Sequence, residues 1–187
     1  DRIRLDYIEN FQVTTEKLSN AMLEHCLWYF FRDGGAPNIF IHGCDGDISL
    51  NDKYESLIEK SVKTDSFEIK GQTFELIHVK LNSNFAQKHE IAYCAANRVV
   101  YAETLSCKNI PGLFRSLQDG DKEFYYAGYL QSSFLTEKVN SERTDFGFAK
   151  DDSDAFANAE PIRREIENKA IEKISEYLEI YLKENRE

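Results

Sequence analysis

The sequence lacks the patterns that most directly reveal a protein's chemistry. It has no Gly-rich phosphate loop of the Walker type, no dinucleotide fingerprint after a strand, and none of the motifs of protein kinases. No apolar run approaches the ~20 residues that a membrane-spanning helix requires, and no signal peptide opens the chain. From these absences we expect a soluble, cytoplasmic protein that has no contact with a membrane.

Cysteine and positive charge are also scarce. Cys26, Cys44, Cys94 and Cys107 form no Cys-x-x-Cys pair, which is unfavourable for a structural zinc site and for a dense disulfide framework. The 23 Lys and Arg residues are outnumbered by 33 Asp and Glu, giving a formal net charge of -10 that opposes nonspecific binding to nucleic acid. Direct nucleic-acid binding is therefore not expected. The only methionine is Met22, and we expect the sequence to be an excerpt of a longer protein.

The apolar content is sufficient for a packed core. The chain has 187 residues, of which 42% are hydrophobic and 13% aromatic, enough for one domain or two small ones. We predict an α/β domain over residues 1–150. A linker and an amphipathic C-terminal helix, over residues 151–187, are expected to pack on the same domain.

Three segments have helical spacing. The first begins at Thr14-Thr15-Glu16 and ends at Asp33-Gly34-Gly35, and a second extends from an Asn51 or Asp52 cap to about Lys63. The third, Ala159 to Glu184, is long and amphipathic. Its apolar positions nearly keep a heptad, so a coiled-coil dimer is the alternative to packing on its own sheet. In the first helix the apolar residues Leu18, Met22, Cys26, Leu27 and Phe30 follow at spacings of three and four.

Strand patterns alternate with these helices. Residues 1–13 and 38–44 are predicted strands, and 66–81 reads as two strands around Lys70-Gly71-Gln72. A second hairpin is predicted from 89–94 and 99–105, because Asn97 tolerates the positive φ of a tight turn. The aromatic-rich segment Glu123 to Gln131 is expected in the middle of the sheet.

The clustered carboxylates at Asp45 to Asp52 have two interpretations. The alternation of Asp45, Asp47, Ser49 and Asn51 is similar to a calcium loop, but the loop's glycine and its final glutamate are replaced by Leu50 and Ser56. A turn followed by a helix cap is the favoured interpretation. A free-standing enzyme that uses this cluster to bind a divalent metal stays as a third alternative for the function.

Arg143 is the residue that the sequence singles out for function. It follows an aromatic strand and the turn residues Val139 and Asn140, and Phe146 and Phe148 are expected to bury the exit of the loop. A guanidinium is always charged and has a planar fork of donors, which suits it to phosphate. The alternative is an ordinary surface loop whose charges pair among themselves, worth ~0–1 kcal/mol.

Several phrases give the chain a family resemblance. The segments Cys94-Ala-Ala-Asn-Arg-Val-Val and Tyr126-Ala-Gly-Tyr, continuing through Asn140-Ser-Glu-Arg-Thr-Asp-Phe, resemble the transducer domain of GHKL (histidine-kinase-like) ATPases. That domain is the middle domain of the ninety-kilodalton heat-shock chaperone, and it also occurs in the mismatch-repair protein MutL. The resemblance covers most of residues 14–148 and is shared with uncharacterised bacterial proteins of this type.

The resemblance implies a fold and a role. The fold is a mixed, mostly antiparallel sheet with helices on one face and a left-handed βαβ crossover. Arg143 would be the catalytic residue that reaches the γ-phosphate of ATP, with Asn140 and Ser141 helping to form the binding loop. ATP and Mg would be bound mainly by an N-terminal ATPase domain that this sequence does not contain, so the segment alone is expected to be inactive and the full-length protein to hydrolyse ATP. A homodimer is left open. The alternative is a protein-protein interaction module with no nucleotide role.

Overall fold

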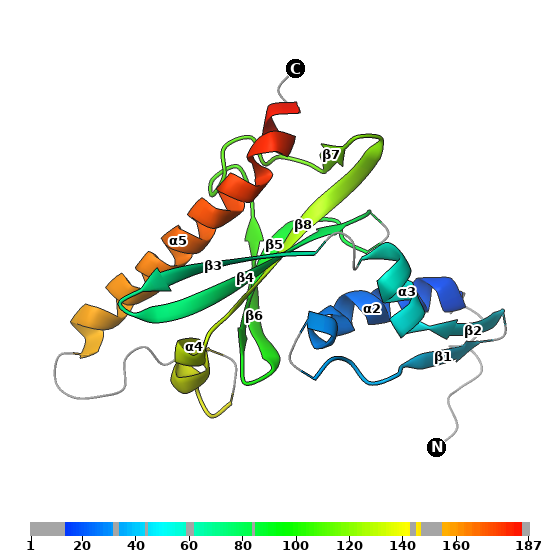
Figure 1. Cartoon of the computed structure of the whole chain (residues 1–187), viewed down its shortest axis with the longest axis horizontal. Coiled ribbons are helices and arrows are strands. Elements are labelled where there is room, and N and C mark those ends of the chain that lie inside the picture. The colour runs from blue at the N-terminus through cyan, green and yellow to red at the C-terminus, as the bar shows by residue number, and fades with distance from the viewer. Residues whose placement is uncertain are drawn as a thin grey trace, which may run out of the picture.

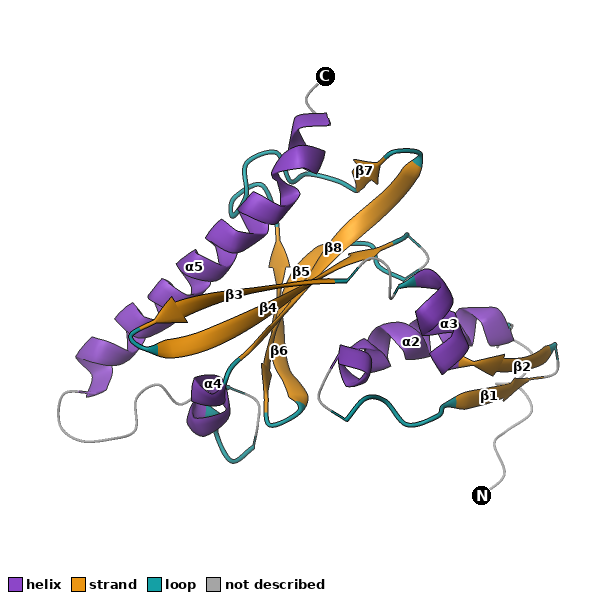
Figure 2. Cartoon of the chain, in the orientation of Figure 1, coloured by secondary structure: helices purple, strands orange, loops and turns teal. Residues whose placement is uncertain are grey.

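The computed structural model describes residues 14–31, 34–43, 45–58, 62–83, 85–142, 145–146 and 155–184. The strand predicted over residues 1–13 lies outside the described residues, and so do residues 150–154 of the linker predicted between Lys150 and Ala159. The other half of that linker, 155–159, is helical, so the prediction is wrong there. Figure 1 shows a central sheet with helices on opposite sides of it, and Figure 2 separates helices from strands by colour.

One mixed sheet forms the centre of the molecule. Its strands are β3 (Lys63–Ile69), β4 (Gln72–Leu81), β5 (His89–Ala95), β6 (Arg98–Leu105), β7 (Leu117–Asp119) and β8 (Lys122–Gln131). The order is β3-β4-β8-β5-β6, and β7 pairs with the first residues of β8. Every pair is antiparallel except β5 with β8. The predicted α+β class with a mostly antiparallel sheet is confirmed, and the aromatic strand β8 does lie in the middle.

The predicted βαβ crossover is wrong. The parallel neighbours β5 and β8 are joined through residues 96–121, all of which are described, and this connection contains β6 and β7 but no helix. The chain turns back at Ala96 and Asn97, whose φ angles of 47° and 62° make the tight β5–β6 turn that the sequence predicted. The route from β5 to β8 therefore begins with a hairpin.

The three inner strands are buried on both faces. In β8, Phe124, Tyr126 and Leu130 point to one face, whereas Ala127 and Tyr129 point to the other. Strands β4 and β5 alternate in the same way, since successive side chains of a strand lie on opposite faces. The sequences of these strands therefore contain continuous apolar runs. A sheet with one solvent-exposed face would instead show alternating apolar and polar residues.

The long helix α5 (Ala155–Glu184) packs on one face of the sheet. Its buried residues recur every four positions, the spacing that keeps one stripe of a helix against a flat partner. They are Ile166, Ala170, Ile174, Leu178 and Leu182. No helix among the described residues is long and apolar enough to cross a membrane.

The opposite face is covered by α2 (Thr15–Phe31) and α3 (Leu50–Leu57), with the hairpin of β1 (Phe40–Gly43) and β2 (Gly46–Ser49) beside them. The prediction of helices on one face only is therefore corrected: the inner strands carry apolar side chains on both faces, and each face needs a cover. Helix α3 is also shorter than predicted. It is capped by Ser49 and ends at Leu57, and β3 begins at Lys63.

Helix α2 does not bury all of the apolar residues that gave it helical spacing. Leu18 and Met22 are 44% and 36% exposed, whereas Leu23, Leu27 and Trp28 are buried against the sheet. The orientation is set in part by polar contacts, because the buried Lys53 of α3 donates to Ser19 at 2.6 Å and to Glu16 at 2.7 Å. These contacts help to decide which side of the helix faces the sheet.

Candidate functional site

The segment that follows β8 is fixed by a helix cap, an isolated β-bridge and a backbone hydrogen bond. Helix α4 (Ser133–Lys138) begins at the cap Ser132, whose hydroxyl accepts a hydrogen bond from the backbone N–H of Leu135 at 2.9 Å. After α4, Val139 forms an isolated β-bridge with Phe146. The backbone N–H of Asn140 donates to the carbonyl of Asp145 at 2.9 Å. The two ends of the segment 140–145 are therefore held together.

Residues 139–146, whose two ends are held together in this way, are called the pinched segment, and the predicted site residues belong to it. Asn140 is half-buried and Ser141 is exposed. Arg143, on which the functional prediction depends, lies outside the described residues. Phe146 is 5% exposed and lies edge-on to Tyr101, with ring centroids 5.8 Å apart. The predicted burial of the loop exit by Phe146 is thus confirmed.

Helix α5 contributes a second arginine close to this segment. The guanidinium of Arg163 lies 4.0 Å from Asp145 and donates to the Tyr101 hydroxyl at 3.2 Å and to Glu167 at 2.8 Å. The hydrogen bond with Glu167 is the largest of several effects that raise the Arg163 pKa above its usual value. Arg163 therefore ties the 139–146 segment to α5 and to β6.

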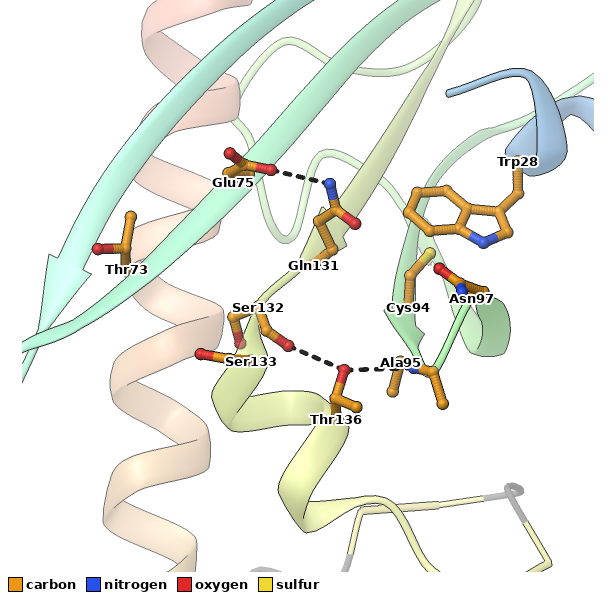
Figure 3. Close-up of a pocket in the computed structure, with 11 residues that line it drawn as sticks. Trp28, Thr73, Glu75, Cys94, Ala95, Asn97, Gln131, Ser132, Ser133 and Thr136 are labelled. Carbon is orange, nitrogen blue, oxygen red and sulfur yellow. Dashed lines mark hydrogen bonds between the residues drawn. The ribbon is translucent and has the colours of Figure 1, made fainter. Parts of the chain in front are cut away.

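A cavity opens at the carboxyl ends of the parallel strands β5 and β8 (Figure 3). Cys94 and Gln131, which are paired across these two strands, both line it. The volume is about 400 Å³. The remaining lining residues come from α2, β4, the β5–β6 turn and α4, and they are Trp28, Thr73, Glu75, Ala95, Ala96, Asn97, Ser132, Ser133 and Thr136.

Several polar groups of the cavity wall are already hydrogen-bonded to one another. Gln131 donates to Glu75 at 2.8 Å. The Thr136 hydroxyl accepts from the backbone N–H of Ala96 at 3.2 Å and donates to the carbonyl of Ser132 at 3.1 Å. These contacts, drawn as dashed lines in Figure 3, fix α4 against the β5–β6 turn and keep the cavity in shape.

Two buried side chains of the cavity wall, Cys94 and Trp28, differ in their reactivity and in their hydrogen bonding. Burial raises the pKa of the Cys94 thiol, so this sulfur stays protonated and is a poor nucleophile. The indole of Trp28 is 3% exposed, and its Nε1 has no hydrogen-bond partner within the described part of the chain. The cavity is therefore suited to binding rather than to thiolate chemistry.

A separate polar network lies under α5. His78 Nδ1 is 2.8 Å from the Tyr126 hydroxyl, and His78 Nε2 is 3.3 Å from Asp65 without the alignment of a hydrogen bond. Burial lowers the His78 pKa to about 4, against a partly opposing effect of Asp65. The ring of Tyr177 stacks on His78 with ring centroids 4.4 Å apart, and His78 is 0% exposed, whereas the Asp65 side chain stays 33% exposed. A Cβ on Gly128 would come within 2.7 Å of the Tyr126 hydroxyl, so only glycine fits there.

The acidic cluster of the β1–β2 hairpin has a structural role. Asp45 accepts from the backbone N–H of Thr15 at 3.1 Å, at the first residue of α2, and Asp47 pairs with His42 at 3.0 Å. Ser49 caps α3 through the N–H of Asp52 at 3.3 Å. Among the residues that the structure describes, no group of three or more His, Cys, Asp or Glu could hold a metal ion. The predicted turn followed by a helix cap is confirmed, with Ser49 as the cap in place of the predicted Asn51 or Asp52.

Sequence reasoning missed the cavity because its wall is assembled from four separate stretches of the chain, at Trp28, 73–75, 94–97 and 131–136. One local signal was available: the polar run Gln131-Ser132-Ser133 begins at the last residue of a buried strand, at the edge where parallel strands often present ligands. Nothing local indicates that Trp28 contributes to the same wall.

The comparisons with known proteins give no assignment: no protein-family model, no curated protein and no solved structure matches the chain.

Proposed function

We propose that this chain is the transducer segment of a GHKL-type ATPase. In this proposal Arg143 senses the γ-phosphate of ATP held by an N-terminal domain and couples nucleotide state to a conformational change. Asn140 and Ser141 would help to form the loop that presents the guanidinium.

The observation that carries the proposal is the pinched segment at the end of the central strand. β8 pairs with β4 over residues 125–131 and with β5 over residues 127–131, so its C-terminal half is a rigid support. The Asn140–Asp145 hydrogen bond and the Val139–Phe146 bridge hold the two ends of the segment together. A charged donor mounted on such a support is preorganised for charge that develops on a phosphate, which is where enzymes gain most from electrostatics.

Arg163 holds the base of the segment from the other side. It pairs with Glu103, Asp145 and Glu167. These contacts join the segment to α5 and to β6, so they add to the rigidity of the support on which the proposal depends.

The test is ATP turnover by the full-length protein with Arg143→Ala. Loss of one preorganised donor typically lowers the rate by ~10²–10³-fold. ATP binding should change little, because the proposal assigns most binding contacts to the other domain. Arg98→Ala is the matched control, since Arg98 is exposed in the β5–β6 turn and should leave turnover unchanged. Turnover that is equal in the wild type and in Arg143→Ala would contradict the proposal.

A second candidate function is a protein-protein interaction module, and one observation favours it. A groove of about 530 Å³ lies between α2 and the β5–β6 hairpin, lined among others by Glu24, Glu90 and the 41% exposed Val99. Burial, and then the charge of Glu90, raises the Glu24 pKa. A partner with a basic and apolar segment would be complementary to this groove. Turnover that is insensitive to Arg143 together with partner binding that is lost in Val99→Asp would favour this function.

A further inference from the structure

The cavity of Figure 3 has the position and size of a small-molecule site. It begins where two adjacent parallel strands, β5 and β8, both end, at the paired residues Cys94 and Gln131. Ligands in sheets with parallel strands characteristically bind outside those carboxyl ends. Its volume of about 400 Å³ falls within the range of small-molecule pockets, about 300–1,000 Å³.

The indole N–H of Trp28 points to a ligand with an acceptor. Trp28 is 3% exposed, and its Nε1 is buried without a partner in the described residues. In Figure 3 this nitrogen lies on the edge of the indole nearest Asn97, whereas the six-membered ring is turned toward Gln131. A buried donor that lacks an acceptor is unfavourable, and such groups in folded proteins usually have a partner that completes them. A hydroxyl or carbonyl oxygen placed in the cavity would supply it.

Further donors and acceptors face the same space. Thr73, Asn97 and Ser133 line the cavity. Within the described part of the chain their side chains form no hydrogen bond. Ser132 and Thr136, by contrast, are held in place by the bonds that fix α4. The wall therefore combines a rigid frame with several unengaged hydroxyl and amide groups, the pattern of a site that orients a polar ligand.

The charges of the residues that line the cavity are unfavourable for binding a phosphate group. Of the residues that line the cavity, all of them described, none is Lys, Arg or His, and Glu75 is the charged one. A dianionic group next to this carboxylate would be repelled, with no cation to compensate. Alanine, the indole and the Cys94 side chain supply the apolar part of the surface.

We infer that this cavity binds an uncharged ring that carries several hydroxyl groups, the chemistry shared by sugars and unphosphorylated nucleosides. Trp28 donates to one ligand oxygen, Asn97 and Ser133 engage its hydroxyl groups, and Glu75 accepts from another. The inference is independent of the proposed function, because none of these residues belongs to the 139–146 segment.

The experiment uses the indole of Trp28, since the chain has one tryptophan. The ¹⁵N–¹H signal of that indole is followed while adenosine, glucose, adenosine monophosphate and glucose 6-phosphate are titrated separately. We expect a saturable shift with adenosine or with glucose, and the responding probe identifies the ligand as a nucleoside or a sugar. The matching phosphate ester should bind at least about tenfold more weakly, because it brings negative charge next to Glu75.

Two variants test the placement. Asn97→Gly removes the amide but suits the positive φ of 62° at this position, and Ser133→Ala removes an exposed hydroxyl, so both should fold. Each should weaken binding several-fold, whereas Asn168→Ala, on the exposed side of α5, should not change it. The inference is overturned if neither neutral probe shifts the indole signal, if the phosphate esters bind equally well, or if both cavity variants bind like the wild type.

Discussion

The two faces of the sheet differ in how completely they are closed. Under α5, apolar side chains and the Asp65–His78–Tyr126 network fill the space, and the cavity near Phe74 and Ile166 is about 50 Å³. On the opposite face α2 and α3 leave spaces of about 400 Å³ and 530 Å³. One sheet therefore supports a closed face that stabilises the fold and an open face with room for ligands or partners.

The difference follows from the helices that cover each face. α5 is 30 residues long and lies across the sheet, whereas α2 has 17 residues and α3 has 8. Two short helices cover the middle of the sheet but not the ends of β5 and β8 or the outer side of β6. The unengaged polar groups lie in those uncovered regions, which is why we place binding there.

The largest expected effect is on the closed face. Ile174 is 0% exposed under α5, so Ile174→Ala should lower the free energy of unfolding by about 2–5 kcal/mol through lost burial and the cavity left behind. Ile180→Ala on the same helix is the matched control, because Ile180 is 61% exposed and its change should stay within about 0.5 kcal/mol. Denaturant unfolding measures both. Equal effects would mean that α5 does not pack as described.

The buried histidine should make the closed face sensitive to acid. The His78 pKa is about 4 in the folded protein, against an ordinary value of 6.5. Between these values the unfolded chain binds a proton that the folded protein does not, so the free energy of unfolding should fall as pH drops from 6.5 to 4. The contribution is roughly 3 kcal/mol.

The control for this effect is His78→Gln, which removes the titrating group. Unfolding free energies of both proteins are measured across the same pH window, so that carboxylates that titrate in both cancel in the difference. The variant should lose the part of the acid sensitivity that belongs to His78. Parallel curves for the two proteins would contradict the assigned cause.

The smallest expected effect concerns the open face. Asp45 accepts from the N–H of Thr15 at the start of α2, and Asp45→Ala should cost about 1 kcal/mol of stability by removing this hydrogen bond. Asp45→Asn retains an acceptor and should cost less. Because α2 carries Trp28, the ¹⁵N–¹H signal of its indole should broaden or move in Asp45→Ala. An unchanged stability in Asp45→Ala would show that the hairpin does not anchor this helix.

Much of the local structure could be predicted from the sequence. Both hairpins of the main sheet, the central position of β8 and the long helix α5 followed from alternation, turn residues and helical spacing. Asn97 is the clearest case, since its tolerance of positive φ placed the β5–β6 turn correctly. The role of Arg143 stays a prediction, because that residue lies outside the described part of the chain.

The sequence by itself determined most of the helices and strands, because hydrophobic period and turn chemistry act between residues a few positions apart. The short elements β2, β7 and α4 were not predicted. Tertiary structure alone decided which stripe of α2 is buried, that β5 and β8 run parallel, and that Trp28 meets Gln131 and Ser133 around one cavity. These outcomes depend on contacts between residues far apart in the chain. Such contacts are selected by the packing of both faces of the sheet at once, which no short window of sequence encodes.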